Sequence, residues 1–151
     1  MAFKWLTRLI PQASEDEENS NALSRAIAVL MLEVAQSDFE ETEEETSTLL
    51  AGLTEHIGEN SQPLEDLLAS ARDDKANSAG LYEFTRLACT EMGLAERCAL
   101  IEQLWNIAYA DGVIDKYEEA AIRKVSELLY VPHSDFIKAK LAAASALNKT
   151  P

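Results

Sequence analysis

Three features of the sequence predict an all-α protein, built as a single domain of about seven helices. Alanine, leucine and glutamate are abundant, whereas the 151 residues include only 5 glycines and 4 prolines, a composition that favours helices. Apolar residues recur at helical spacing along the chain, and no segment shows the sustained alternation of a strand. One helix–turn–helix pattern is also written twice, so we expect two pseudo-symmetric helical hairpins within the domain.

The length of the chain allows one core that buries about 70% of the unfolded surface without help from disulfides or metal. Cys89 and Cys98 form no CxxC motif and have no histidines at metal-ligand spacing, so we expect two small thiols, buried or half-buried. We expect residues 20–147 to form the helical domain. Residues 1–19 are expected to lie outside it, as a short amphipathic helix followed by an acidic linker.

The charge of the chain is strongly negative, with a formal net charge of −14. Residues 1–60 hold 3 basic and 13 acidic groups, and residues 61–151 hold 10 and 14. Such a field repels nucleic acid and anionic membrane surfaces, and it attracts cations or basic partners. No apolar run approaches the roughly 18–20 residues of a transmembrane helix, and the first residues lack the cleavage site of a secretory signal. We therefore expect a cytoplasmic protein that binds no nucleic acid.

Residues 2–10 have the spacing of a short amphipathic helix, which Pro11 would end. Lys4 and Arg8 fall on its polar side. Its apolar side consists of Phe3, Leu6, Leu9 and Ile10. Three docking partners stay open for this segment, namely the domain itself, another protein, or a membrane, on which one short helix is a weak anchor. Residues 12–20 are acidic with nothing to bury, which is typical of a linker.

The helices of the domain follow from apolar spacing and from their start and stop signals. In chain order they cover about residues 20–36, 43–58, 63–71, 79–92, two segments within 100–131, and a last segment after Pro132. The polar run at residues 72–80 is expected to connect the two halves. Ser134 can cap the last helix, whose expected buried residues are Phe136, Ile137, Leu141 and Ala144.

The segment 100–131 reads as a helix, a tight acidic turn and a second helix. Gly112 is expected to end the first helix, because glycine tolerates the positive φ that such an end often needs. Asp115 can cap the second helix, and Glu118 can reach back to the Asp115 amide to complete a capping box. The carboxylates of Asp111 and Glu118 are thereby aimed at the junction of the two helices.

An offset of 73 residues lays an earlier segment on this one with no gap. The matched pairs are Ile27 with Leu100, Met31 with Leu104, Val34 with Ile107, Ala35 with Ala108, Asp38 with Asp111, Thr42 with Asp115, Glu45 with Glu118, and Leu49 with Ile122. Thr42 and Glu45 supply the T-x-x-E pattern of a second capping box. The simplest interpretation is one domain that contains two related hairpins.

The acidic turns are the candidate functional sites, with two interpretations that stay open. The candidate metal ligands are Asp111, Asp115 and Glu118 in the second turn, and Asp38 and Glu45 in the first. Carboxylates of this kind bind hard divalent cations, but they also cap helix N-termini. The turn is no EF-hand, because the first ligand positions would be Ile107 and Tyr109.

No catalytic residue is predicted. His56 and His133 stand in no motif that joins a nucleophile to an orienting acid, and a glycine-rich phosphate loop is absent from the sequence. No cofactor is expected other than a divalent cation.

The segment Trp105–Arg123, W-x-x-A-Y-A-D-G-x-x-D-x-x-E-x-x-x-I-R, resembles the TerB-like family of bacterial tellurite-resistance-associated proteins. LYEFTRL at residues 81–87 and VPHSDFIKAKL at 131–141 are similar to a small cytoplasmic branch of it, and the resemblance covers about residues 20–142. It implies an all-α fold with internal pseudo-two-fold symmetry. It also implies divalent-metal binding in a stress response, often beside membrane-associated partners. Phe39 departs from the family pattern, since glycine belongs there.

Together these observations predict a non-enzymatic TerB-like helical module that binds a divalent cation weakly, or a partner, through its acidic hairpins. The partner would be a basic or membrane-associated protein. One alternative is a structural interaction module whose acidic turns are only caps. Another is a carboxylate-based, metal-assisted hydrolase.

Overall fold

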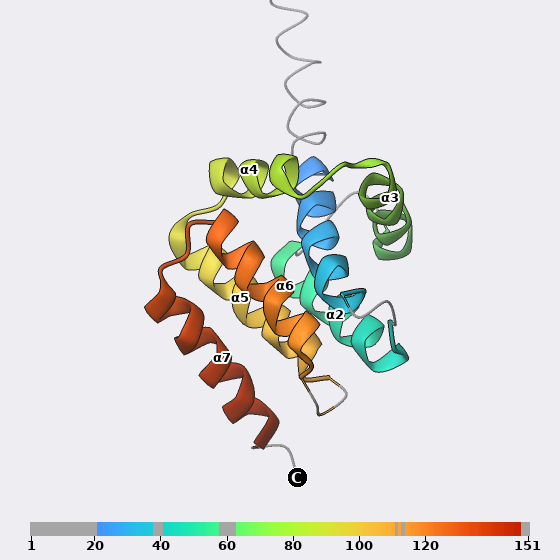
Figure 1. Cartoon of the computed structure of the whole chain (residues 1–151). Coiled ribbons are helices and arrows are strands. Elements are labelled where there is room, and N and C mark those ends of the chain that lie inside the picture. The colour runs from blue at the N-terminus through green and yellow to red at the C-terminus, as the bar shows by residue number, and fades with distance from the viewer. Residues whose placement is uncertain (1–20, 38–40, 58–62, 111, 113, 149–151) are drawn as a thin grey trace, which may run out of the picture.

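A computed structural model describes residues 21–37, 41–57, 63–110, 112 and 114–148, which form helices and turns and contain no strand. Helical residues 21–35 come first in the chain (Figure 1). They are followed by α2 (Glu43–Ile57), α3 (Leu64–Asn77), α4 (Tyr82–Glu91), α5 (Leu94–Ala108), α6 (Lys116–Leu128) and α7 (His133–Asn148). The prediction of an all-α fold with about seven helices is confirmed.

The helix over residues 21–35 runs through the middle of the molecule, with the other helices around it (Figure 1). Residues 26–32, the apolar run AIAVLML, are all buried without a break. A helix that is apolar on every side can be stable only inside a core. Residues 26–32 therefore present apolar side chains on every side of this helix, and the surrounding helices cover all of these side chains.

Helix α5 is the second organising element, because it packs against α2, α6 and α7. Its buried residues are Leu100, Ile101, Leu104, Trp105, Ile107 and Ala108. The Trp105 ring lies 5.4 Å from the ring of Phe136 on α7 and 6.2 Å from that of Tyr109. Trp105 is fully buried, as expected for a core aromatic.

The two predicted hairpins correspond to residues 21–35 with α2, and to α5 with α6. All five apolar pairs of the repeat are buried in both copies. They are Ile27 and Leu100, Met31 and Leu104, Val34 and Ile107, Ala35 and Ala108, and Leu49 and Ile122. The copies differ at Leu30, which is fully buried, because its counterpart Gln103 is only half-buried. The first copy is thus the more deeply enclosed.

The polar run at residues 72–80 is largely helical, which corrects the prediction of a connector. Helix α3 continues to Asn77 because its charged residues find partners on neighbouring segments. Arg25 Nε lies 3.1 Å from Asp74 Oδ2, and Glu33 Oε2 lies 3.7 Å from Lys75 Nζ. These pairs tie α3 to the central helix.

The predicted buried face of α7 is partly wrong. Phe136 is buried, but Ile137 is 36% exposed and Leu141 61% exposed. Ala139 and Ala143 are buried instead, because α7 approaches α5 along a face of small side chains.

Helix α7 begins at His133, so Ser134 lies within its first turn and is not the cap. The Pro132 carbonyl accepts hydrogen bonds from the Asp135 and Phe136 amides, each at 3.0 Å. Helix α4 likewise begins later than predicted, at Tyr82, with Leu81 before it.

Candidate functional site

The second acidic turn joins α5 to α6. Gly112 has a positive φ of +86°, as predicted, but it lies in the turn beyond α5, which ends at Ala108 with Tyr109 as its C-cap. Asp115 Oδ1 accepts a hydrogen bond from the Glu118 amide at 2.8 Å, and Glu118 Oε1 accepts one from the Asp115 amide at 3.3 Å. The predicted capping box is therefore present, and it fixes two carboxylates at one helix N-terminus. Glu118 is only 2% exposed.

The first acidic turn leads from the central helix into α2, and it repeats this arrangement. Thr42 Oγ1 accepts a hydrogen bond from the Glu45 amide at 3.1 Å. In return, Glu45 Oε1 accepts from the Thr42 hydroxyl at 3.1 Å and from the Thr42 amide at 3.4 Å. Glu45 is 1% exposed, so both hairpins bury the glutamate that closes the capping box.

A half-buried ion pair distinguishes the first turn from the second. Arg72 of α3 donates from Nη1 to Glu41 Oε1 at 2.9 Å and from Nη2 to Glu41 Oε2 at 2.8 Å. Gln36 and Thr46 also donate to Glu41. Hydrogen bonds from Arg72 are the main reason that the pKa of Glu41 falls from 4.5 to about 2, against the opposing effect of burial.

No pattern in the sequence indicated the pairing of Glu41 with Arg72, because the partner is 31 residues away. The offset of 73 lays Glu41 on Ile114, a half-buried residue that packs against the core. One turn is therefore anchored by a paired charge and the other by an apolar side chain.

Of the five predicted metal ligands, the described residues include Asp115, Glu118 and Glu45, whereas Asp38 and Asp111 lie outside them. Asp115 and Glu118 come together through the capping box. Within the described part of the chain, no three His, Cys, Asp or Glu side chains are close enough together to hold a metal ion.

Neither the two cysteine thiols nor the His133 side chain shows an arrangement that favours catalysis. Both cysteines are free and half-buried, as predicted. Burial raises the pKa of the Cys98 thiol and the charge of Asp135 raises it further, which disfavours the reactive thiolate. His133 is exposed, with its ring 5.8 Å from that of Phe136. The side chain of His56 lies outside the described residues.

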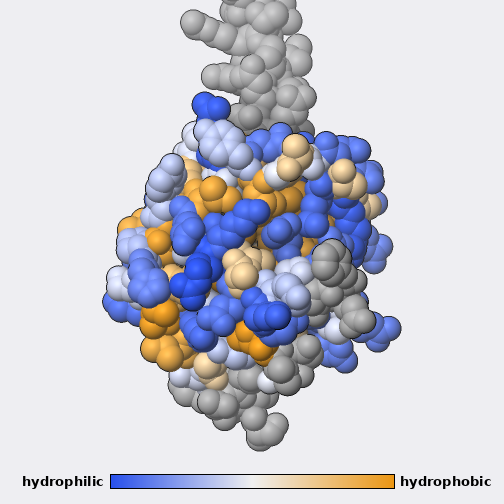
Figure 2. Space-filling model, in the orientation of Figure 1, coloured by the Kyte–Doolittle hydropathy of each residue, from blue (hydrophilic) through white to orange (hydrophobic). Residues whose placement is uncertain are grey.

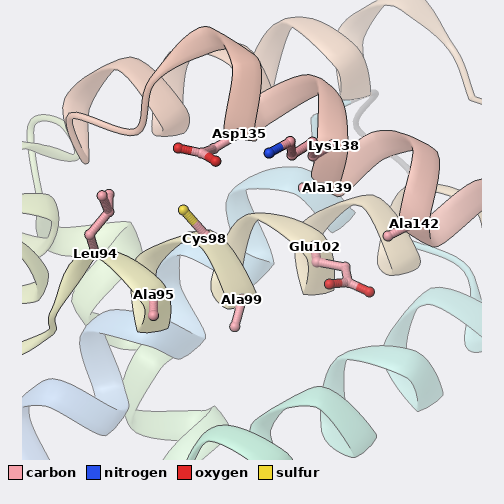
Figure 3. A pocket seen from close by; sticks show the side chains of 9 residues that line it. All are labelled: Leu94, Ala95, Cys98, Ala99, Glu102, Asp135, Lys138, Ala139 and Ala142. Atoms are coloured by element: carbon pink, nitrogen blue, oxygen red, sulfur yellow. The ribbon is translucent and has the colours of Figure 1, made fainter.

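A groove of about 550 Å³ runs between the first half of α5 and α7. We call it the α5–α7 groove. It is lined by Leu94, Ala95, Cys98, Ala99, Glu102, Asp135, Lys138, Ala139 and Ala142. Figure 3 shows Leu94 and Cys98 of α5 facing the same space as Asp135 and Lys138 of α7. The sequence did not predict this groove, because its two walls are 40 residues apart along the chain.

The fold and the paired capping boxes define a class of protein, a helical module built from two related hairpins with acidic turns. A family model described as tellurite resistance protein TerB matches residues 24–141. The chain belongs to the TerB family. No curated protein and no solved structure matches it. Among the helices that the structure describes, none has the length and hydrophobicity needed to cross a membrane.

Proposed function

We propose that this chain is a non-enzymatic binding module of the cytoplasm, and that its second acidic turn takes up a divalent cation through Asp111, Asp115 and Glu118. The observation that carries the proposal is the capping box, which holds the Asp115 and Glu118 carboxylates at one turn. The net charge of −14 adds a field that concentrates cations. A role in a stress response such as tellurite resistance is supported by the family alone.

The second turn suits a cation better than the first, where Asp38 and Glu45 are the candidates. The Arg72 guanidinium lies against Glu41 in the first turn and cancels part of its negative charge. The position of Glu41 is occupied in the second turn by Ile114, an apolar side chain that forms no ion pair.

The second candidate function is an interaction module in which the acidic turns serve only as caps. Two observations favour it, namely the complete hydrogen bonding of both capping boxes and the open α5–α7 groove. A carboxylate cap contributes on the order of 1 kcal/mol without any metal.

Charge-neutral substitutions separate the two functions. Asparagine is as good an N-cap as aspartate, and glutamine can replace glutamate in a capping box. Asp115→Asn and Glu118→Gln therefore preserve the caps but weaken any cation site. We expect millimolar Ca²⁺, Mg²⁺ or Mn²⁺ to raise the melting temperature of the native chain but not of these variants. Without ion, the variants should be at least as stable as the native chain, because like charges no longer repel.

The control is Glu44→Gln, which removes an exposed carboxylate from the first turn of α2 and should respond to the ion as the native chain does. Asp115→Ala removes the cap and should cost about 1 kcal/mol with or without ion. If the native melting temperature does not move at millimolar ion, the cation proposal is wrong and the interaction module remains.

A further inference from the structure

The α5–α7 groove combines a small-residue floor with an exposed apolar rim. Ala95, Ala99 and Ala142 are exposed alanines that leave room for larger side chains above them. At the rim, the lining residue Leu94 is 45% exposed. Figure 2 shows hydrophobic surface at the lower left, where α7 lies. Apolar surface gathered around a concave site is typical of a place where another segment binds.

We propose that residues 2–10 of the same chain dock in the α5–α7 groove. Phe3, Leu6 and Ile10 have the i, i+3, i+7 spacing with which an amphipathic helix enters a groove. Large apolar side chains on the segment would meet alanines on the groove floor. Every other stretch outside the described residues is five residues long or shorter. This docking does not depend on whether the second acidic turn binds a cation.

The charges of the segment and of the domain are complementary. Residues 2–10 carry Lys4 and Arg8 and no acidic residue, in a chain whose net charge is −14. Glu102 and Asp135 stand on opposite walls of the groove, with Lys138 as the basic lining residue. A segment lying with its apolar side in the groove keeps Lys4 and Arg8 on its outer side, where these basic side chains remain in the negative field of the chain.

The linker is long enough for the segment to reach its groove. Ala22 lines a hollow together with Phe84 and Leu87 of α4, so the start of the central helix lies beside α4. From Leu87 the chain needs seven residues to reach Leu94 at the groove, a path of at most about 25 Å. Residues 11–20 can span up to about 33–36 Å when extended.

Cys98 lines the groove and reports on its occupancy. In the full-length Cys89→Ser chain, we expect a maleimide to alkylate Cys98 slowly. Leu6→Asp/Ile10→Asp should accelerate alkylation about tenfold, since a segment docked about nine-tenths of the time shields the thiol. The matched control Gln12→Asp/Ser14→Asp adds the same charge in the linker and should leave the rate unchanged. Equal rates in all three chains would overturn the proposal.

A cross-link identifies the occupant directly. In the Cys89→Ser background and with copper phenanthroline as the oxidant, Leu6→Cys should form a disulfide with Cys98 within one chain, visible as an oxidised monomer on a non-reducing gel. Ala142→Trp fills the groove and should reduce the yield, whereas Ala76→Trp at an exposed position of α3 should not. A cross-linked dimer would show that a second copy supplies the segment and would contradict docking within the chain. So would a chain that forms no cross-link but sediments with anionic phosphatidylglycerol vesicles.

Discussion

Glu41 shows how a single residue acquires its role from the tertiary structure. It stands in the first acidic turn, for which the sequence leaves helix caps and a cation site open. In the folded chain its carboxylate accepts bidentate hydrogen bonds from Arg72, and it also accepts hydrogen bonds from Gln36 and Thr46. Its ionised form is therefore strongly favoured, and the turn is fastened to α3.

We predict that Glu41→Gln destabilises the protein at pH 7 by about 1–2 kcal/mol, less than the pKa shift alone implies because Arg72 is partly in water. Since the pKa of Glu41 falls from 4.5 to about 2 on folding, this stability is present above pH 4.5 and is lost as the pH falls toward 2. Urea unfolding measures the free energy of unfolding of the native chain and of Glu41→Gln. The difference between the two chains should be smaller at pH 3 than at pH 7. An equal loss at both pH values, or an equal loss in the exposed control Glu44→Gln, would contradict the assignment.

At the scale of a single element, α7 shows how packing partners select a helix face. Its apolar residues are spread around the helix, so the sequence offers more than one candidate face. Contact with α5 selects the side with Phe136, Ala139 and Ala143, because small side chains allow close approach to Trp105 and its neighbours. Leu141 is left outside, with 61% of its surface exposed.

We predict opposite outcomes for two alanine substitutions in α7. Phe136→Ala should cost about 3–5 kcal/mol, because it empties a buried site beside Trp105. Leu141→Ala should change the free energy of unfolding by no more than about 0.5 kcal/mol, because its side chain is largely in solvent. Urea midpoints measure both. A large loss at Leu141 would contradict its position in solvent.

In the whole molecule, two related hairpins occupy unlike environments. The first supplies the central helix, which is enclosed on all sides over residues 26–32, and the second supplies α5, which keeps a half-exposed strip. Leu30 and Gln103 occupy the same position of the repeat, but Leu30 is fully buried and Gln103 is half-buried. Gln103 donates to Glu55 of α2, and Asn106 donates to Gln103 at 3.4 Å.

We therefore predict that exchanging the two residue types has unequal effects. Leu30→Gln should cost about 3 kcal/mol or more, because it buries an amide without hydrogen-bond partners. Gln103→Leu should cost about 1 kcal/mol or less, since it removes hydrogen bonds at a half-buried site. Thermal unfolding followed by far-ultraviolet circular dichroism measures both changes. Similar costs at the two sites would show that the hairpins are enclosed to the same degree.

The sequence by itself determined the features that depend on neighbours within one or two helical turns. Helical periodicity predicted the all-α fold, and the three-residue spacing from Asp115 to Glu118 predicted a capping box that the structure contains. The offset of 73 predicted which apolar residues of the two hairpins are buried. The motif from Trp105 to Arg123 was enough to indicate the TerB family.

The tertiary structure alone decided the features that join distant segments. The helical state of residues 72–77 depends on partners in the central helix, and the low pKa of Glu41 depends on Arg72. The α5–α7 groove exists because α7 presents alanines where longer side chains would have filled the space. Local spacing specifies which faces a helix offers, but the surfaces that meet it in the folded chain decide which of those faces is buried, paired or left open.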